Sequence, residues 1–175
     1  MMQFPEPSEY GDYYGKYISK VKEEDIRALL MSQVEELLFY FKQLPKGKTG
    51  TPYAEGKWTY KELLGHIIDT EKIMYFRALC IARNEQQPLP GFDQDEYVKA
   101  MDFNEVPIAD FLEDFELIRR SISYFVKHLQ DGAIGRMGIV NGHLTSVRAL
   151  LFIIAGHFEH HLEILKSISQ TNAGK

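Results

Sequence analysis

Apolar residues recur along four segments of the chain in steps that alternate between three and four residues. This spacing places them on one face of a helix, because an α-helix completes a turn in about 3.6 residues. The most regular stripe consists of Phe111, Phe115, Ile118, Ile122, Phe125 and Leu129. The other segments run from Ile26 to Leu44, from Tyr60 to about Arg83, and from Thr145 to about Ser169. The pattern predicts four amphipathic helices of about 20 residues each.

Capping and breaking residues indicate where these helices begin and end. A loop rich in Pro and Gly, 45–56, ends the first helix. Thr59 and Glu62 have the spacing of a capping box, which predicts the start of the second helix. Pro107 suits the first turn of the third helix, and Thr145 is the expected cap of the fourth.

Two long connections separate the helices. The first covers residues 84–106, where Asp93 to Glu96 predicts the start of a short extra helix, and the second is rich in glycine. The sequence shows no convincing pair of strands and no internal repeat. These features predict an all-α four-helix bundle in one domain over residues 1–175, with its core at about 20–169. The order of the helices stays open at this point.

Composition narrows the possible partners. The 175-residue chain is 45% hydrophobic and carries a net charge of −5, so it lacks the clustered basic face of a protein that binds nucleic acid. Its longest apolar run, Ala149–Ala155, is far shorter than the roughly 20 residues of a membrane span. The lone Cys80 and the absence of a recognisable signal peptide favour the cytoplasm. We therefore expect a small-molecule substrate or a second copy of the chain as partner, and neither nucleic acid nor membrane.

Two histidines interrupt the apolar stripe of the fourth helix. The stripe consists of Val147, Leu150, Ile154, His157, His161, Ile164 and Ile168. The i,i+4 spacing of the histidines puts both rings on one face, close enough to share a cation. A buried ring nitrogen without a partner costs about 1–3 kcal/mol, and a metal ion would supply that partner.

A third candidate ligand, His66, stands among apolar residues near the start of the second helix. If the second and fourth helices are neighbours, three imidazoles can converge inside the bundle. Three histidines leave coordination positions open for water or substrate, as in catalytic sites. The alternative is that His66 is an ordinary core histidine with a hydrogen-bond partner. A zincin motif is excluded because Phe158 stands where its glutamate would be.

Other polar residues near these histidines have two interpretations. Asp69 could orient the ring of His66 through its second nitrogen, or it could pair with Lys72 on the surface. His160 falls off the apolar stripe and is expected to flank the site.

Two arginines remain open to either of two roles. Arg77 and Arg148 could bind an anionic substrate, although surface salt bridges are the usual role of such residues.

Three stretches resemble the DinB/YfiT-like superfamily. They are Glu55–Thr59 continued by Lys61–Glu71, Pro88–Asp95, and Thr145–Leu150 continued by Ala155–His161. The similarity extends from about Tyr10 to Ile168. It implies a bundle with up-down-down-up topology, commonly a homodimer, and a metal site whose ligand positions correspond to His66, His157 and His161.

The resemblance also implies chemistry. Members of the superfamily are described as metal-dependent hydrolases, and a subset transfer low-molecular-weight thiols to electrophiles. We expect one divalent ion (nickel, zinc, manganese or iron) that activates such a thiol or water. The alternative is a non-catalytic binding module or dimer, stabilised by metal and acting in a stress response.

Overall fold

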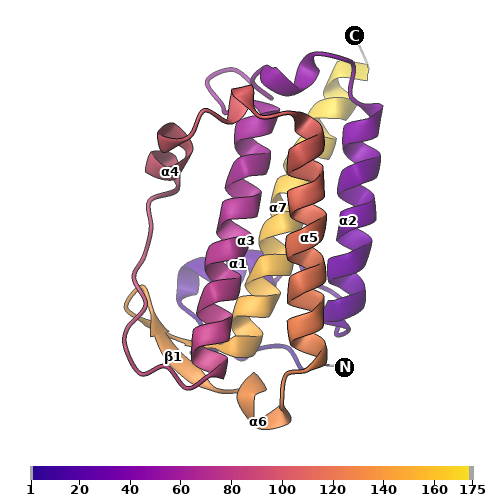
Figure 1. The fold of residues 1–175 in the computed structure, drawn as a ribbon. Helices are drawn as coiled ribbons and strands as arrows, with labels where there is room; N and C mark the ends of the chain where they lie inside the picture. The colour runs from indigo at the N-terminus through magenta and orange to yellow at the C-terminus, as the bar shows by residue number, and fades with distance from the viewer. Residues whose placement is uncertain (1, 174–175) are drawn as a thin grey trace.

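Four long helices form the bundle in the computed structural model, which describes the backbone of residues 2–173 and the side chains of residues 2–167. They are α2 (Ile26–Gln43), α3 (Tyr60–Ala82), α5 (Ile108–Lys127) and α7 (Val147–Ala173). In Figure 1, α2 and α7 run upward while α3 and α5 run downward. The expected up-down-down-up four-helix bundle is therefore confirmed.

The packing of the four long helices places α3 beside α7. α3 packs against α5 and α7, and α2 packs against the same two helices. Because α3 and α7 are antiparallel (Figure 1), the second turn of α3, which carries His66, lies level with the middle of α7, which carries His157 and His161. The second and fourth long helices are therefore neighbours, as the convergence of the three histidines requires.

Local capping explains most of the helix boundaries. The Thr59 hydroxyl accepts from the Glu62 amide at 3.1 Å, and the Glu62 carboxylate accepts from the Thr59 amide at 2.7 Å. The predicted capping box is thus confirmed. Asp93 caps α4 (Gln94–Ala100), which is the expected short helix.

The cap of α7 lies one residue later than expected. Ser146, the last residue of the strand that precedes α7, accepts a hydrogen bond from the Ala149 amide at 2.9 Å, whereas the Thr145 hydroxyl donates to the His143 carbonyl at 3.3 Å. The side chain of Ile168, the last position of the predicted stripe, lies outside the described residues.

A small antiparallel hairpin precedes α7, so the prediction of no strand pairs was wrong. Its strands are β1 (Met137–Val140) and β2 (His143–Ser146). Asn141 and Gly142 connect them with φ of 49° and 80°, which is the backbone of the two-residue turns that favour Asn-Gly. Leu89 pairs with Val140, so the hairpin also anchors the first long connection.

Short elements complete the fold. They are η1 (Pro7–Glu9), η2 (Asp12–Tyr14), α1 (Gly15–Ile18), η3 (Lys48–Gly50), η4 (Phe103–Glu105) and α6 (Asp131–Ile134). α1 packs against α7 at Gly156, where a Cβ would collide with the carbonyl oxygen of Tyr17. This close approach holds the side chain of Tyr17 beside His157.

The core consists of two apolar clusters divided by a polar layer at mid-bundle. One cluster includes Leu30, Met74, Ile122 and Ile154, and the other includes Leu37, Ile67, Phe115 and Phe158. Each long helix changes from one cluster to the other at a buried polar residue, namely Gln33, Glu71, Arg119 and His157. No described helix is long and apolar enough to cross a membrane.

We expect Gly156→Ala to lower the free energy of unfolding by about 1–3 kcal/mol, because the added methyl group must displace α1. Gly132→Ala is the control, because a Cβ there meets nothing within 4 Å. Urea denaturation of the two variants measures the difference. Equal stability of Gly156→Ala and the wild type would contradict the close packing of α1 on α7.

Candidate metal centre

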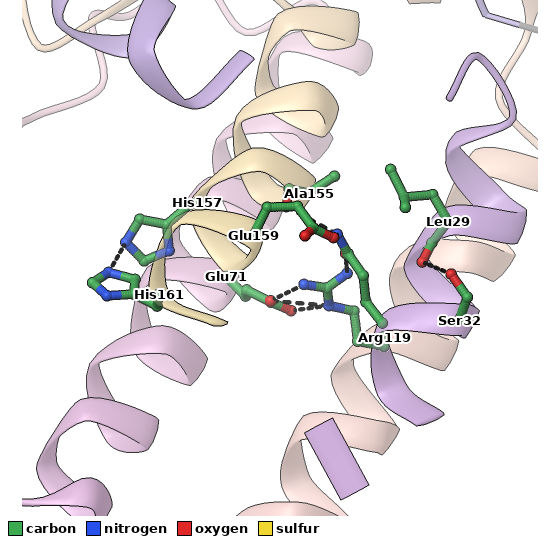
Figure 2. A network of polar contacts seen from close by, with 9 residues as sticks. Leu29, Ser32, Glu71, Arg119, Ala155, His157, Glu159 and His161 are labelled. Carbon is green, nitrogen blue, oxygen red and sulfur yellow. Dashed lines mark hydrogen bonds and ion pairs between the residues drawn. The ribbon is translucent and has the colours of Figure 1, made fainter. Parts of the chain in front are cut away.

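Three buried histidines from two helices meet at mid-bundle. The Nε2 atom of His157 lies 3.1 Å from that of His66 and 3.1 Å from that of His161. One nitrogen from each ring lies within 4.8 Å of the others. Figure 2 shows His157 and His161 turned toward each other from successive turns of α7. The structure therefore brings together the three residues that the sequence singled out.

These contacts fit a shared cation better than they fit hydrogen bonds between the rings. A ring nitrogen carries either one hydrogen or one lone pair, so the Nε2 of His157 cannot make a good hydrogen bond in both contacts. Separations of 3.1 Å are what two nitrogens have when each lies about 2.0–2.1 Å from one ion. The donor set thus fits a divalent metal.

Burial keeps the three rings neutral. His66, His157 and His161 are at most 8% exposed. Loss of hydration lowers the pKa of His66 to about 4 and that of His161 to about 2, and it lowers the pKa of His157 well below its ordinary value. Neutral imidazole is the form that binds metal.

Aromatic rings restrain two of the three histidines. The Trp58 ring lies 5.0 Å from His66, and the Tyr17 ring lies 5.2 Å from His157, centroid to centroid. Trp58 comes from the loop before α3, and Tyr17 comes from α1. α1 and the loop before α3 therefore help to hold the site, together with α3 and α7.

A cavity of about 400 Å³ adjoins the histidines. Its wall includes His66 and His157 as well as parts of the N-terminal segment, the connection after α3 and the hairpin turn. The volume lies within the range of small-molecule sites, which is roughly 300–1,000 Å³. A small molecule in this cavity would contact His66 and His157 directly.

The polar layer next to the histidines joins all four long helices. Arg119 on α5 donates to both carboxylate oxygens of Glu71 on α3 at 2.5–2.9 Å and to Gln33 on α2 at 2.5 Å (Figure 2). Gln33 in turn donates to the carbonyl of Ala155 and to Glu159, both on α7. Glu71 and Arg119 are fully buried, so each requires the other as counterion.

The sequence contained a signal for this layer that was missed. Glu71 stands four residues after Ile67 and three before Met74, and Arg119 stands four after Phe115 and three before Ile122. Charged residues at core spacing on two helices indicate a buried ion pair.

Asp69 and His160, the two residues expected to flank the site, do not belong to the histidine cluster. Asp69 borders a different hollow, beside the ion pair of Lys72 and Asp114, and within the described residues it makes no hydrogen bond to His66. His160 is half-buried, with its ring 5.1 Å from that of His161 and 5.4 Å from that of Tyr17. It is not among the residues whose nitrogens converge.

Fold and site together define an all-α four-helix bundle with a buried three-histidine cluster open to a cavity. Residues 29–165 match the model of the DinB superfamily. The chain belongs to this superfamily, as the sequence motifs indicated.

Proteins that are similar in sequence to the chain carry related names. A protein of Oceanobacillus iheyensis is 29% identical over 124 residues, which are 70% of this chain and 70% of that protein. A protein of Halalkalibacterium halodurans is 25% identical over 151 residues, 82% of this chain and 86% of the relative. Both are named "Putative metal-dependent hydrolase".

Two solved structures share the fold. YfiT from Bacillus subtilis, described as a probable metal-dependent hydrolase with an unusual four-helix bundle topology, superposes with a TM-score of 0.77 at 16% identity. The match covers 98% of this chain and 94% of YfiT. A mycothiol-dependent maleylpyruvate isomerase gives a TM-score of 0.67 at 12% identity, over 85% of this chain and 62% of that protein.

The metal-free protein is expected to lose stability as the pH falls from 6.5 toward 4. In this window the histidines of the unfolded chain take up protons while the buried rings stay neutral, so the free energy of unfolding rises with pH. The expected loss between pH 7 and pH 5 is about 1–2 kcal/mol for each histidine. Urea denaturation with a chelator present measures it, and His161→Gln should reduce the slope. An identical slope in wild type and variant would contradict the assignment.

Arg119→Met is expected to lower the free energy of unfolding by about 3–5 kcal/mol, because it leaves the Glu71 carboxylate buried without a counterion. Lys72→Met, which breaks the exposed pair with Asp114, should cost no more than about 1 kcal/mol. Chemical denaturation of both variants provides the comparison. Similar costs for the two would show that the buried pair does not bear on the bundle's stability as described.

Proposed function

We propose that the protein is a metal-dependent enzyme in which His66, His157 and His161 hold one divalent ion. The observation that carries the proposal is the convergence of three neutral imidazoles at the wall of a cavity, with the Nε2 atom of His157 lying 3.1 Å from that of each of the other two. Neutral ligands leave the charge of the ion uncompensated, which suits a Lewis acid. The relatives named as metal-dependent hydrolases support this class of function.

The protein's own residues would bind and orient the reactants. The imidazoles offer lone pairs because burial keeps them unprotonated. Tyr17 and Trp58 restrict the rings, and the surrounding apolar clusters limit access of bulk water. A divalent ion bound there would lower the pKa of a water or thiol and so supply a nucleophile near neutral pH.

Of the two nucleophiles, we favour a low-molecular-weight thiol. Glu71, the buried carboxylate of the polar layer, is bound to Arg119 and is therefore not free to accept a proton from water. A thiol ionises more readily and needs less help from a general base. The fold shared with a mycothiol-dependent isomerase supports the same choice, and the hydrolase names of the relatives support water as the alternative.

We expect elemental analysis of the purified protein to find one nickel, zinc, manganese or iron ion per chain. His66→Ala, His157→Ala and His161→Ala should each lower the bound metal at least about tenfold, because each removes one of the three proposed protein ligands. His128→Ala, which changes an exposed histidine outside the cluster, is the matched control. Full metal occupancy in His161→Ala would contradict the site.

Removal of the metal distinguishes the two hypotheses, an enzyme and a metal-stabilised module without catalytic activity. Assays of thiol transfer and of ester or amide hydrolysis, before chelation and after reloading, report on catalysis, while Tm reports on stability. The proposal predicts activity that disappears and returns with the metal. A large fall in Tm with no activity in either assay would favour the non-catalytic alternative.

A further inference from the structure

Arg77 is a buried cation that has no carboxylate partner among the residues whose side chains the structure describes. It lies on α3, is 2% exposed, and borders the same cavity as His66 and His157. Its guanidinium donates to the Pro90 carbonyl at 2.5 Å and to the Met74 sulfur at 3.4 Å. In the part of the chain that the structure describes, none of the ion pairs involves Arg77.

The structure distinguishes the two arginines, Arg77 and Arg148, whose roles the sequence left open. Arg148 is paired with Glu9, so its charge is already compensated. Arg77 also lies near the hydroxyls of Tyr14 and Tyr97 and 5.6 Å from the ring centroid of Phe92, and none of these groups is a carboxylate. A guanidinium has five N–H donors, and its protein acceptors do not use them all. A buried charge without a counterion is unfavourable, and an anionic ligand would relieve that cost.

Thr70 adds to the same wall a buried hydroxyl that has no hydrogen-bond partner among the described residues. The residue is 4% exposed. His66, Thr70, Met74 and Arg77 follow one another in steps of four, four and three, so they share one face of α3. The cavity therefore has the histidine cluster toward one end of this face and the guanidinium toward the other.

We propose that this cavity binds a small molecule with a carboxylate group, for which Arg77 is the counterion and Thr70 supplies a further hydrogen bond. The reacting group of the same molecule would then lie at the histidines. In that respect the inference rests on the proposed function, because it takes the cavity as the substrate site. The anion site itself does not require the metal.

The test compares hexanoate with hexanamide, a neutral molecule of similar shape, by isothermal titration of the nickel-loaded and the metal-free full chain. We expect hexanoate to bind at least about tenfold more tightly in both forms, as for a hydrogen-bonded charge pair. Arg77→Gln should abolish this preference, and Arg77→Lys should restore part of it. Thr70→Val should weaken hexanoate binding by about threefold. Arg148→Gln is the control and should change nothing.

Three results would overturn the inference. They are equal affinity of hexanoate and hexanamide for the wild type, a preference that survives Arg77→Gln, and a preference that exists only with nickel bound. An unchanged affinity in Thr70→Val would contradict the role given to Thr70. The wild-type comparison remains decisive even if Arg77→Gln does not fold. Loss of the metal site would leave the metal-free result intact, so failure of the proposed function and failure of this inference can be distinguished.

Discussion

Three neutral imidazoles that face one another in an apolar interior constrain the structure of this protein. Their nitrogens lie too close together to be independent, and a single shared Nε2 atom cannot satisfy two neighbours through hydrogen bonds. An ion between them satisfies all three lone pairs at once. The packing of α3 beside α7 brings the three rings together. Burial keeps the rings neutral, and the adjoining cavity gives a small molecule access to His66 and His157.

The polar layer helps to align the helices so that the three imidazoles meet. Arg119 connects α5 to α3 through Glu71 and to α2 through Gln33, and Gln33 continues to α7. Apolar packing alone tolerates small shifts of one helix along another, whereas a fully buried ion pair does not. We infer that this layer fixes the height of α3 relative to α7, and therefore the distance between His66 and His157.

Periodicity was sufficient to predict the four long helices, and capping residues predicted the capping box at Thr59 and the short helix after Asp93, because these features depend on local chemistry. It also selected His66, His157 and His161, since histidine at core spacing is unusual. The hairpin was missed although Asn141-Gly142 is a strong turn signal, because the surrounding glycines suggested a loop. Helix order came from the resemblance alone.

The remaining features depend on contacts between distant segments. No local pattern shows that Arg77 lacks a counterion among the described residues while Arg148 has one, because the partner of Arg148 is Glu9, far away in the sequence. The same holds for the ring of Tyr17 beside His157 and for the placement of Asp69 in a separate hollow. Such relations require the tertiary structure.

X-ray absorption spectroscopy of the zinc-loaded protein tests the central claim most directly, because it reports the identity and distance of the atoms bound to the ion. The account predicts three imidazole nitrogens at about 2.0–2.1 Å, with an exchangeable oxygen or sulfur ligand completing the shell. A spectrum that contains no imidazole scattering, or that requires sulfur from Cys80 as a ligand in place of histidine, would contradict it.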